Sequence, residues 1–132
     1  MTTYLLDANV LIALTVVEHE HHTRASEWAA GIERFAVCPV VEGALVRFLV
    51  RIGEKAETAA AVLRQVRARP GYEFWADSMS YADASLGHVR GHRQVTDAYL
   101  ASLATDRGGM LATLDEALVA VLPNSAVLVA PH

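Results

Sequence analysis

The chain opens with Tyr4-Leu5-Leu6-Asp7-Ala8-Asn9-Val10-Leu11-Ile12, in which a short apolar run stops at an aspartate and a second apolar stretch follows. The first run is typical of a strand buried in a parallel sheet. Asp7 stands where a helix N-cap is expected, because its carboxylate can accept a hydrogen bond from a free backbone N–H of the first turn. This stretch therefore predicts a strand over 4–6 that leads through Asp7 into a helix over 8–14.

The rest of the chain repeats this alternation. Further strands are predicted over 35–38, 72–75, 110–113 and 126–129, and further helices over 23–32, 40–52, 54–68, 95–105 and 115–121, with a short one at 81–86. Strands that alternate with helices favour a mostly parallel sheet with helices on both faces. With 132 residues, 53% of them hydrophobic, the chain is expected to form one α/β domain over 1–132 with four to five strands.

Composition and charge exclude several classes of protein. Every apolar run meets a charge too early for a transmembrane helix, and the first residues lack the basic segment of a signal peptide, so we expect no membrane contact. Cys38 is the only cysteine, which excludes an intramolecular disulfide and a cysteine-based zinc cage and favours a cytoplasmic location. The net charge of −4 does not attract nucleic acid overall. Binding of a polyanion would need local arginines or a bound cation.

Four acidic residues are predicted near the carboxyl ends of the strands, where ligands collect in open α/β sheets. Asp7 and Asp115 follow strands, while Glu42 and Asp97 stand in the first turn of helices. Carboxylates in one place repel one another unless a cation joins them, and an all-oxygen site suits Mg²⁺ or Mn²⁺. Each acid also stands at a helix N-terminus, where capping and the helix dipole explain it equally well. The sequence leaves both interpretations open.

Four motifs resemble those of the PIN domain, the nuclease fold found in the VapC toxins of VapBC toxin–antitoxin pairs. They are Leu5-Leu6-Asp7-Ala8-Asn9-Val10-Leu11-Ile12, Val41-Glu42 with Arg47 following, Val95-Thr96-Asp97-Ala98-Tyr99-Leu100-Ala101, and Ala112-Thr113-Leu114-Asp115. The resemblance covers essentially the whole chain in length and element order. Many relatives have phenylalanine after the last aspartate, whereas this chain has Glu116, which makes Glu116 an alternative to Asp115 as the fourth acid.

The resemblance implies a Mg²⁺- or Mn²⁺-dependent endoribonuclease that acts as a toxin, is neutralised by a VapB-type antitoxin and forms a homodimer. The catalytic metal ligands would be Asp7, Glu42, Asp97 and Asp115, and the bound metal would activate the water that attacks the RNA phosphodiester.

Further residues would support this chemistry. Side chains expected to hydrogen-bond the ligands are those of Asn9, Thr96 and Thr113. The first candidates for contacts with RNA phosphates are Arg47 and Arg51, which share a helix face, followed by Arg90 and Arg93.

The principal alternative is a non-catalytic PIN-like binding module whose acids cap helices or contact a partner. A haloacid-dehalogenase phosphatase would need a second aspartate where Asn9 stands. A response-regulator receiver would need a lysine near a late strand, whereas Lys55, in mid-chain, is the only lysine. A cluster at His19, His21 and His22 is crowded in a polar turn, and we expect a solvated loop there rather than a metal site.

Overall fold

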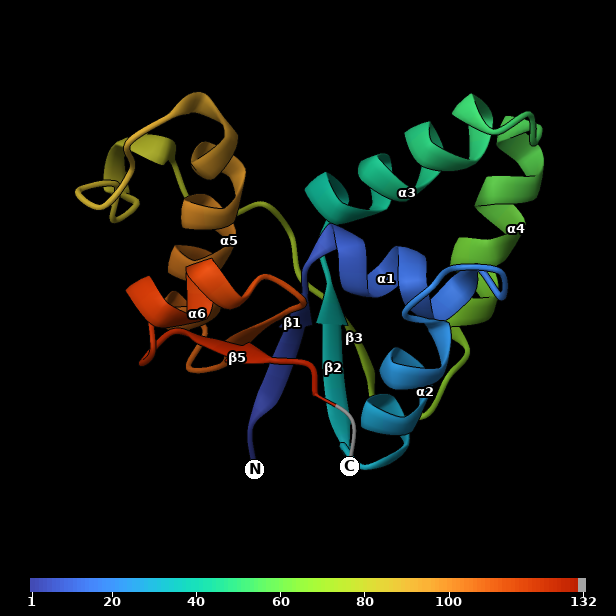
Figure 1. The fold of residues 1–132 in the computed structure, drawn as a ribbon, viewed down its shortest axis with the longest axis horizontal. Helices are drawn as coiled ribbons and strands as arrows, with labels where there is room; N and C mark the ends of the chain where they lie inside the picture. The colour runs from blue at the N-terminus through green and yellow to red at the C-terminus, as the bar shows by residue number, and fades with distance from the viewer. Residues whose placement is uncertain (131–132) are drawn as a thin grey trace.

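Five parallel strands form the sheet on which the other elements are assembled (Figure 1). The computed structural model describes residues 1–130, and its strands are β1 (Thr3–Leu6), β2 (Arg34–Val37), β3 (Tyr72–Phe74), β4 (Met110–Thr113) and β5 (Ala126–Leu128). Their order across the sheet is β3-β2-β1-β4-β5, with every neighbouring pair parallel. The prediction of a parallel α/β sheet of up to five strands is confirmed. Cys38, predicted as a strand residue, is instead the N-cap of the next helix, because Pro39 begins that helix.

The strand order reverses at β1, and this reversal positions the acidic residues. From β1 the chain proceeds to β2 and β3 on one side, and then returns to β4 and β5 on the other. In open parallel sheets the carboxyl ends of the two strands at such a reversal flank a natural ligand site. Asp7 follows β1 directly and Asp115 follows β4 after one residue, so both aspartates lie at this point.

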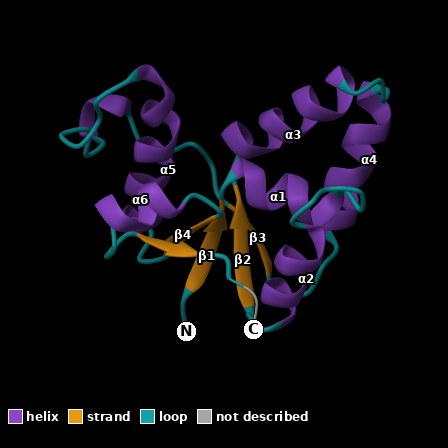
Figure 2. Ribbon diagram, viewed as in Figure 1, coloured by secondary structure: helices purple, strands orange, loops and turns teal. Residues whose placement is uncertain are grey.

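Helices cover both faces of the sheet (Figure 2). On one side lie α1 (Ala8–Thr15), α2 (His22–Ala30), α3 (Pro39–Arg51) and α4 (Ala56–Arg67), and on the other lie α5 (Val95–Asp106) and α6 (Glu116–Val121). Right-handed crossovers produce this division when the strand order reverses. Within residues 1–130 no helix is both long enough and apolar enough to cross a membrane.

The segment between β3 and α5 departs from the prediction. The prediction of a helix over 81–86 is wrong beyond Asp83. Only a single 3₁₀ turn (Tyr81–Asp83) forms there. Ala84 has an extended backbone, and the N–H of Ser85 donates to the Oγ of Ser102 at 2.9 Å instead of to a helical carbonyl. A second 3₁₀ turn (His92–Gln94) then leads into α5.

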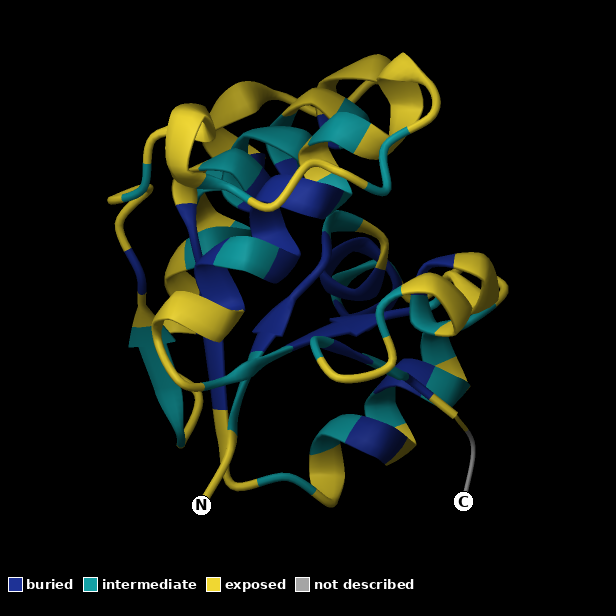
Figure 3. Ribbon diagram, turned by 90° about the vertical axis from the view of Figure 1, so that its left-hand side faces the viewer, coloured by how far each residue is buried: buried dark blue, intermediate teal, exposed yellow. Residues whose placement is uncertain are grey.

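The core lies between the sheet and its helices, so the central strands β1, β2 and β4 are mostly buried, whereas the edge strand β3 is not (Figure 3). The largest fully buried side chains come from the strands and the facing helices, namely Leu5, Leu6, Leu11, Leu45, Tyr99, Leu100, Leu103 and Leu111. Each such side chain contributes about 1.5–3 kcal/mol through burial. The strand ends that carry the acidic residues are therefore held by a well-packed core.

Candidate functional site

Asp7 is the most deeply buried carboxylate of the strand ends. Its side chain is 5% exposed, and it caps α1 by accepting a hydrogen bond from the N–H of Ala8 at Oδ1 (2.6 Å). The hydroxyl of Thr113 donates to Oδ2 at 2.8 Å. Burial raises the pKa of Asp7, the two hydrogen bonds oppose that rise, and the charge of Asp115 adds to it.

Asp97, in the first turn of α5, lies near the charges of Asp7 and Asp115. Burial, followed by the nearby carboxylates of Asp7 and Asp115, raises its pKa to about 7. Within residues 1–130 no arginine or lysine charge acts on the pKa of Asp7 or of Asp97. The structure thus brings three of the predicted acids into one electrostatic centre, which we call the acidic centre (Asp7, Asp97 and Asp115).

Asp115 combines this position with a structural role. Its Oδ1 caps α6 by accepting hydrogen bonds from the N–H groups of Ala117 (2.9 Å) and Leu118 (3.2 Å). Its own N–H donates to the hydroxyl of Thr113 at 3.0 Å. The buried Thr113 hydroxyl therefore links the backbone of Asp115 to the carboxylate of Asp7, and it fixes both residues in relation to β4.

A cavity of about 70 Å³ borders the acidic centre and has Asp97, Asp115, His88, Gln94 and Leu118 among its walls. The Nε2 atom of His88 is buried and has no hydrogen-bond partner among the described residues. Such a ring nitrogen needs a partner from a ligand or from solvent. Sequence reasoning missed His88, which lies in a loop without periodicity, and nothing in its local sequence could have singled it out.

Glu42, the fourth predicted acid, lies in the first turn of α3 and is partly buried. Burial and the charge of Asp77 raise its pKa, while the charge of Arg67 lowers it. Asp7 and Asp97 are not among the groups that shift it, so the structure does not bring Glu42 into the acidic centre's field. The assignment of Glu42 as a metal ligand stays a prediction.

Asp77 is a further acid that the sequence analysis did not single out. It follows β3 by three residues and also faces the thiol of Cys38, whose pKa burial and Asp77 together raise to about 11. The rule that identified Asp7, an acid just beyond the carboxyl end of a strand, could have identified it.

The donor set fits a hard dication by its chemistry. In the part of the chain that the structure describes, no three His, Cys, Asp or Glu side chains are close enough together to hold a metal ion. The acidic centre nevertheless offers carboxylate oxygens that repel one another and that no cationic side chain neutralises. Oxygen donors of this kind are those that Mg²⁺ and Mn²⁺ prefer.

Comparison with known proteins shows the family to which this fold belongs. The family model described as PIN domain matches residues 4–121. The chain belongs to the PIN domain family. Among curated relatives, Ribonuclease VapC29 of Mycobacterium tuberculosis is 51% identical over 128 residues, which cover 96% of each chain. Ribonuclease VapC38 of the same organism is 40% identical over 120 residues, or 84% of each chain.

Solved structures agree with the fold of this PIN domain. The Sarcin-Ricin loop cleaving toxin VapC20 of Mycobacterium tuberculosis superposes with a TM-score of 0.69 at 16% identity, covering 89% of this chain and 94% of that one. VapBC2 of Rickettsia felis, bound to a DNA fragment from its promoter, gives 0.65 at 18% identity, covering 96% and 97%. At these identities the likeness concerns the fold alone.

The side chains expected to hydrogen-bond the metal ligands differ from one another in exposure and contacts. Thr113 contacts Asp7 directly, as described above. Asn9 is exposed on α1, and Thr96 is exposed in the first turn of α5, whose N-cap is Gln94. Glu116, the alternative fourth acid, is exposed in the first turn of α6.

The predicted phosphate contacts are all exposed arginines. Arg47 extends back along α3, so that a Cβ at Gly43 would lie 3.4 Å from its Nη1. Arg51 ends the same helix, and Arg93 lies in the second 3₁₀ turn. Arg90 differs, because its Nη1 donates to the carbonyl oxygen of Gly87 in its own loop (3.2 Å).

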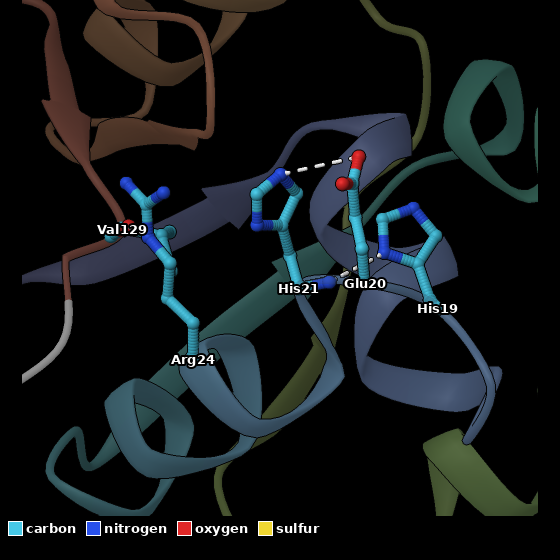
Figure 4. A network of polar contacts seen from close by, with 5 residues as sticks. All are labelled: His19, Glu20, His21, Arg24 and Val129. Atoms are coloured by element: carbon cyan, nitrogen blue, oxygen red, sulfur yellow. Dashed lines mark hydrogen bonds and ion pairs between the residues drawn. The ribbon is translucent and has the colours of Figure 1, made fainter.

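The histidine-rich turn before α2 makes local contacts (Figure 4). The N–H of His21 donates to Nδ1 of His19 at 3.0 Å, and the His21 ring lies 3.6 Å from the carboxylate of Glu20. Nδ1 of His22 lies 2.8 Å from the carbonyl oxygen of Ala13. Arg24, in α2, donates to the carbonyl oxygen of Val129 and so ties this helix to the end of β5. His19 and His21 thus lie in the loop between α1 and α2, and His22 begins α2.

Proposed function

We propose that this PIN domain is the toxin of a toxin–antitoxin pair and hydrolyses RNA phosphodiesters at the acidic centre with Mg²⁺ or Mn²⁺ as cofactor. The observation that carries the proposal is the gathering of three carboxylates that have no cationic partner among the described residues. Burial, followed by the charges of Asp7 and Asp115, raises the pKa of Asp97 there to about 7. The names of the curated relatives, Ribonuclease VapC29 and Ribonuclease VapC38, support the same activity. We also propose that the enzyme acts in the cytoplasm, where it would meet RNA.

A dication at this centre would polarise the scissile phosphate and lower the pKa of an attacking water. Asp7 and Asp97 would bind it, with Asp115, Glu42 or Glu116 completing the set. Thr113 and the N–H of Ala8 hold the two oxygens of Asp7 in fixed directions, which keeps the carboxylate from rotating away. With a pKa of about 7, Asp97 is about half protonated at neutral pH in the metal-free protein, and the proton must be released before Asp97 can act as a ligand.

The test is RNA cleavage by the purified chain with Mg²⁺, with Mn²⁺ and with excess chelator. We expect cutting of single-stranded RNA only with metal, and Asp97→Asn should reduce it by at least about a hundredfold, because a loss of several kcal/mol of transition-state stabilisation is at stake. Asp106→Asn, an exposed carboxylate at the other end of α5, is the matched control. Cutting in chelator, or an undiminished Asp97→Asn enzyme, would contradict the mechanism.

A non-catalytic binding module remains the second candidate, because Asp7 and Asp115 do cap helices. Titration with Mn²⁺ separates the two functions. The enzyme should bind Mn²⁺ and lose that binding on Asp7→Ala, whereas a module that uses its acids only as caps should not bind the metal at all.

The proposal also specifies the partners. An antitoxin of the VapB type should neutralise the enzyme by placing a basic side chain at the acidic centre, where it would meet the charges of Asp7 and Asp97. A structure of a complex whose contacts avoid both residues would contradict this. We further propose a homodimer, which sedimentation of the purified chain can test.

A further inference from the structure

A groove of about 470 Å³ lies beside the edge strand β3, apart from the cavity of the acidic centre. Its walls come from α4, β3 and the start of α3, and they include Glu42, Leu63, Arg64, Arg67, Tyr72 and Phe74. We call it the Phe74 groove. It therefore combines two aromatic side chains, two arginines and one of the predicted catalytic acids.

The aromatic side of the groove is unusual for its exposure. Phe74, the last residue of β3, is 54% exposed, although phenylalanine is among the residue types most often buried. Tyr72 is partly buried and holds an edge-to-face contact with Phe35, with 5.7 Å between ring centroids. Phe74 thus presents a ring with no aromatic partner among residues 1–130, two residues from a ring that contacts the core. An exposed ring of this kind can stack with a nucleobase of any identity.

The basic side of the groove faces the same space. Arg64 and Arg67 are exposed in the last turn of α4, three residues apart, so that both guanidinium groups lie on one helix face. Neither forms a salt bridge within the described part of the chain. The charge of Arg67 acts on the nearby carboxylate of Glu42, and both planar guanidinium groups can still bind the oxygens of a phosphate.

The position of the groove would also allow one RNA strand to reach both the groove and the acidic centre. All five strands are parallel, so Phe74 and Asp7 mark the same edge of the sheet. β3 is two strands away from β1, a distance of about 10 Å at the usual strand spacing. Glu42, in the first turn of the helix that follows the intervening strand β2, lines the groove. A short single strand can therefore span from the ring of Phe74 to the acids.

We infer that the Phe74 groove binds single-stranded RNA, with one base stacked on Phe74 and a neighbouring phosphate held by Arg64 and Arg67. This inference rests on the proposed function and adds to it the path by which substrate reaches the acidic centre. It also accounts for RNA binding by a chain with a net charge of −4, because the contacts are local.

The test measures binding rather than cutting. Fluorescence anisotropy of a labelled single-stranded RNA of mixed sequence is recorded in EDTA at low salt, for the full chain and its variants. We expect Phe74→Ala to weaken binding by about tenfold or more, and Phe74→Leu to weaken it nearly as much, because leucine keeps the apolar bulk but cannot stack. The double variant Arg64→Gln/Arg67→Gln should reduce the slope of log K against log salt by about 0.7 for each lost phosphate contact.

Arg34→Gln is the matched control, since Arg34 is exposed at the amino end of β2, opposite the acids. It should shift the salt slope much less than the double variant. Unchanged affinity in the Phe74 and arginine variants would overturn the inference, as would wild-type protein that does not bind RNA under these conditions. Variants that bind RNA normally but alter self-association or antitoxin binding would instead assign the groove to a protein partner.

The assignment of the Phe74 groove and the proposed nuclease function can fail independently of each other. If wild-type enzyme cuts RNA with metal while the Phe74 and arginine variants bind like wild type, only the groove assignment fails. If the variants lose binding in EDTA while no metal supports cutting, the groove stands and the nuclease proposal fails.

Discussion

Asp97→Asn should make the metal-free protein more stable than wild type at pH 8, although it should abolish catalysis. The reason lies in the pKa of Asp97, which the fold raises from 3.8 to about 7. The folded state therefore binds this proton more tightly than the unfolded state. Stability falls as pH rises from about 4 to about 7, and above that range the folded protein carries the full cost of the charge. Asparagine is neutral throughout and avoids this cost.

The shift in the pKa of Asp97 sets the size of the expected stability difference. A shift of about three pKa units corresponds to roughly 4 kcal/mol at most, at 1.36 kcal/mol for each unit. Asp97 is partly exposed, so water screens the charge, and we expect a gain of about 1–2 kcal/mol for Asp97→Asn at pH 8. At pH 4 the two proteins should differ by less than about 0.5 kcal/mol, because both side chains are then largely neutral.

Urea denaturation in EDTA at pH 4, 6 and 8 measures these differences, with Asp106→Asn as the exposed control. Added Mg²⁺ or Mn²⁺ should then reverse the order, because the metal stabilises only the protein that binds it. Asp97→Asn protein that is equally or less stable than wild type at pH 8 in EDTA would refute the reasoning. It would mean that burial and the charges of Asp7 and Asp115 do not raise the pKa of Asp97.

Two further substitutions test the supports of the site. Thr113→Val removes the hydroxyl that donates to Asp7 and accepts from the Asp115 N–H, so Mn²⁺ affinity in calorimetric titration should fall about 10- to 100-fold; unchanged affinity would show that this hydroxyl does not orient the ligand. Gly71→Ala should cost more than about 1 kcal/mol in urea denaturation, because Gly71 has a φ of +84° and an added Cβ would lie 2.0 Å from the carbonyl oxygen of Glu33. Gly87→Ala, where nothing lies within 4 Å, is its control, and equal effects of the two would contradict the argument.

The sequence predicted those parts of the site that depend on a strand and the residue after it. Asp7 and Asp115 are fixed by the ends of β1 and β4, and parallel pairing necessarily brings those ends to one edge. Asp97 could be placed near them because it stands in the first turn of α5, a helix that packs on β1 and β4. Local pattern and topology placed these three residues near one edge, but only the resemblance to the PIN domain predicted that they meet in one centre.

The loop between β3 and α5 could not be predicted in the same way. Its course depends on contacts with distant side chains, such as the hydroxyl of Tyr99, which donates to the carbonyl oxygen of Met79 at 2.9 Å. Tyr81 stacks on the same tyrosine, with 4.5 Å between ring centroids. His88 in the same loop lines the cavity of the acidic centre, and no periodic pattern in 76–94 predicts its place there.

The surroundings of Glu42 could not be predicted from its position along the helix alone. Pro39 begins α3 and the buried face of that helix runs through Val41, Leu45 and Leu49, which places Glu42 on the flank of the helix, about 100° from Val41. Which flank faces the acidic centre depends on how α3 packs against α1 and α4, and in this structure Glu42 faces Arg67 and the Phe74 groove. The same carboxylate thus borders the inferred RNA path. If Glu42 is also a metal ligand, it would connect substrate binding to metal binding, because a phosphate held by Arg67 would compete with Glu42 for that arginine.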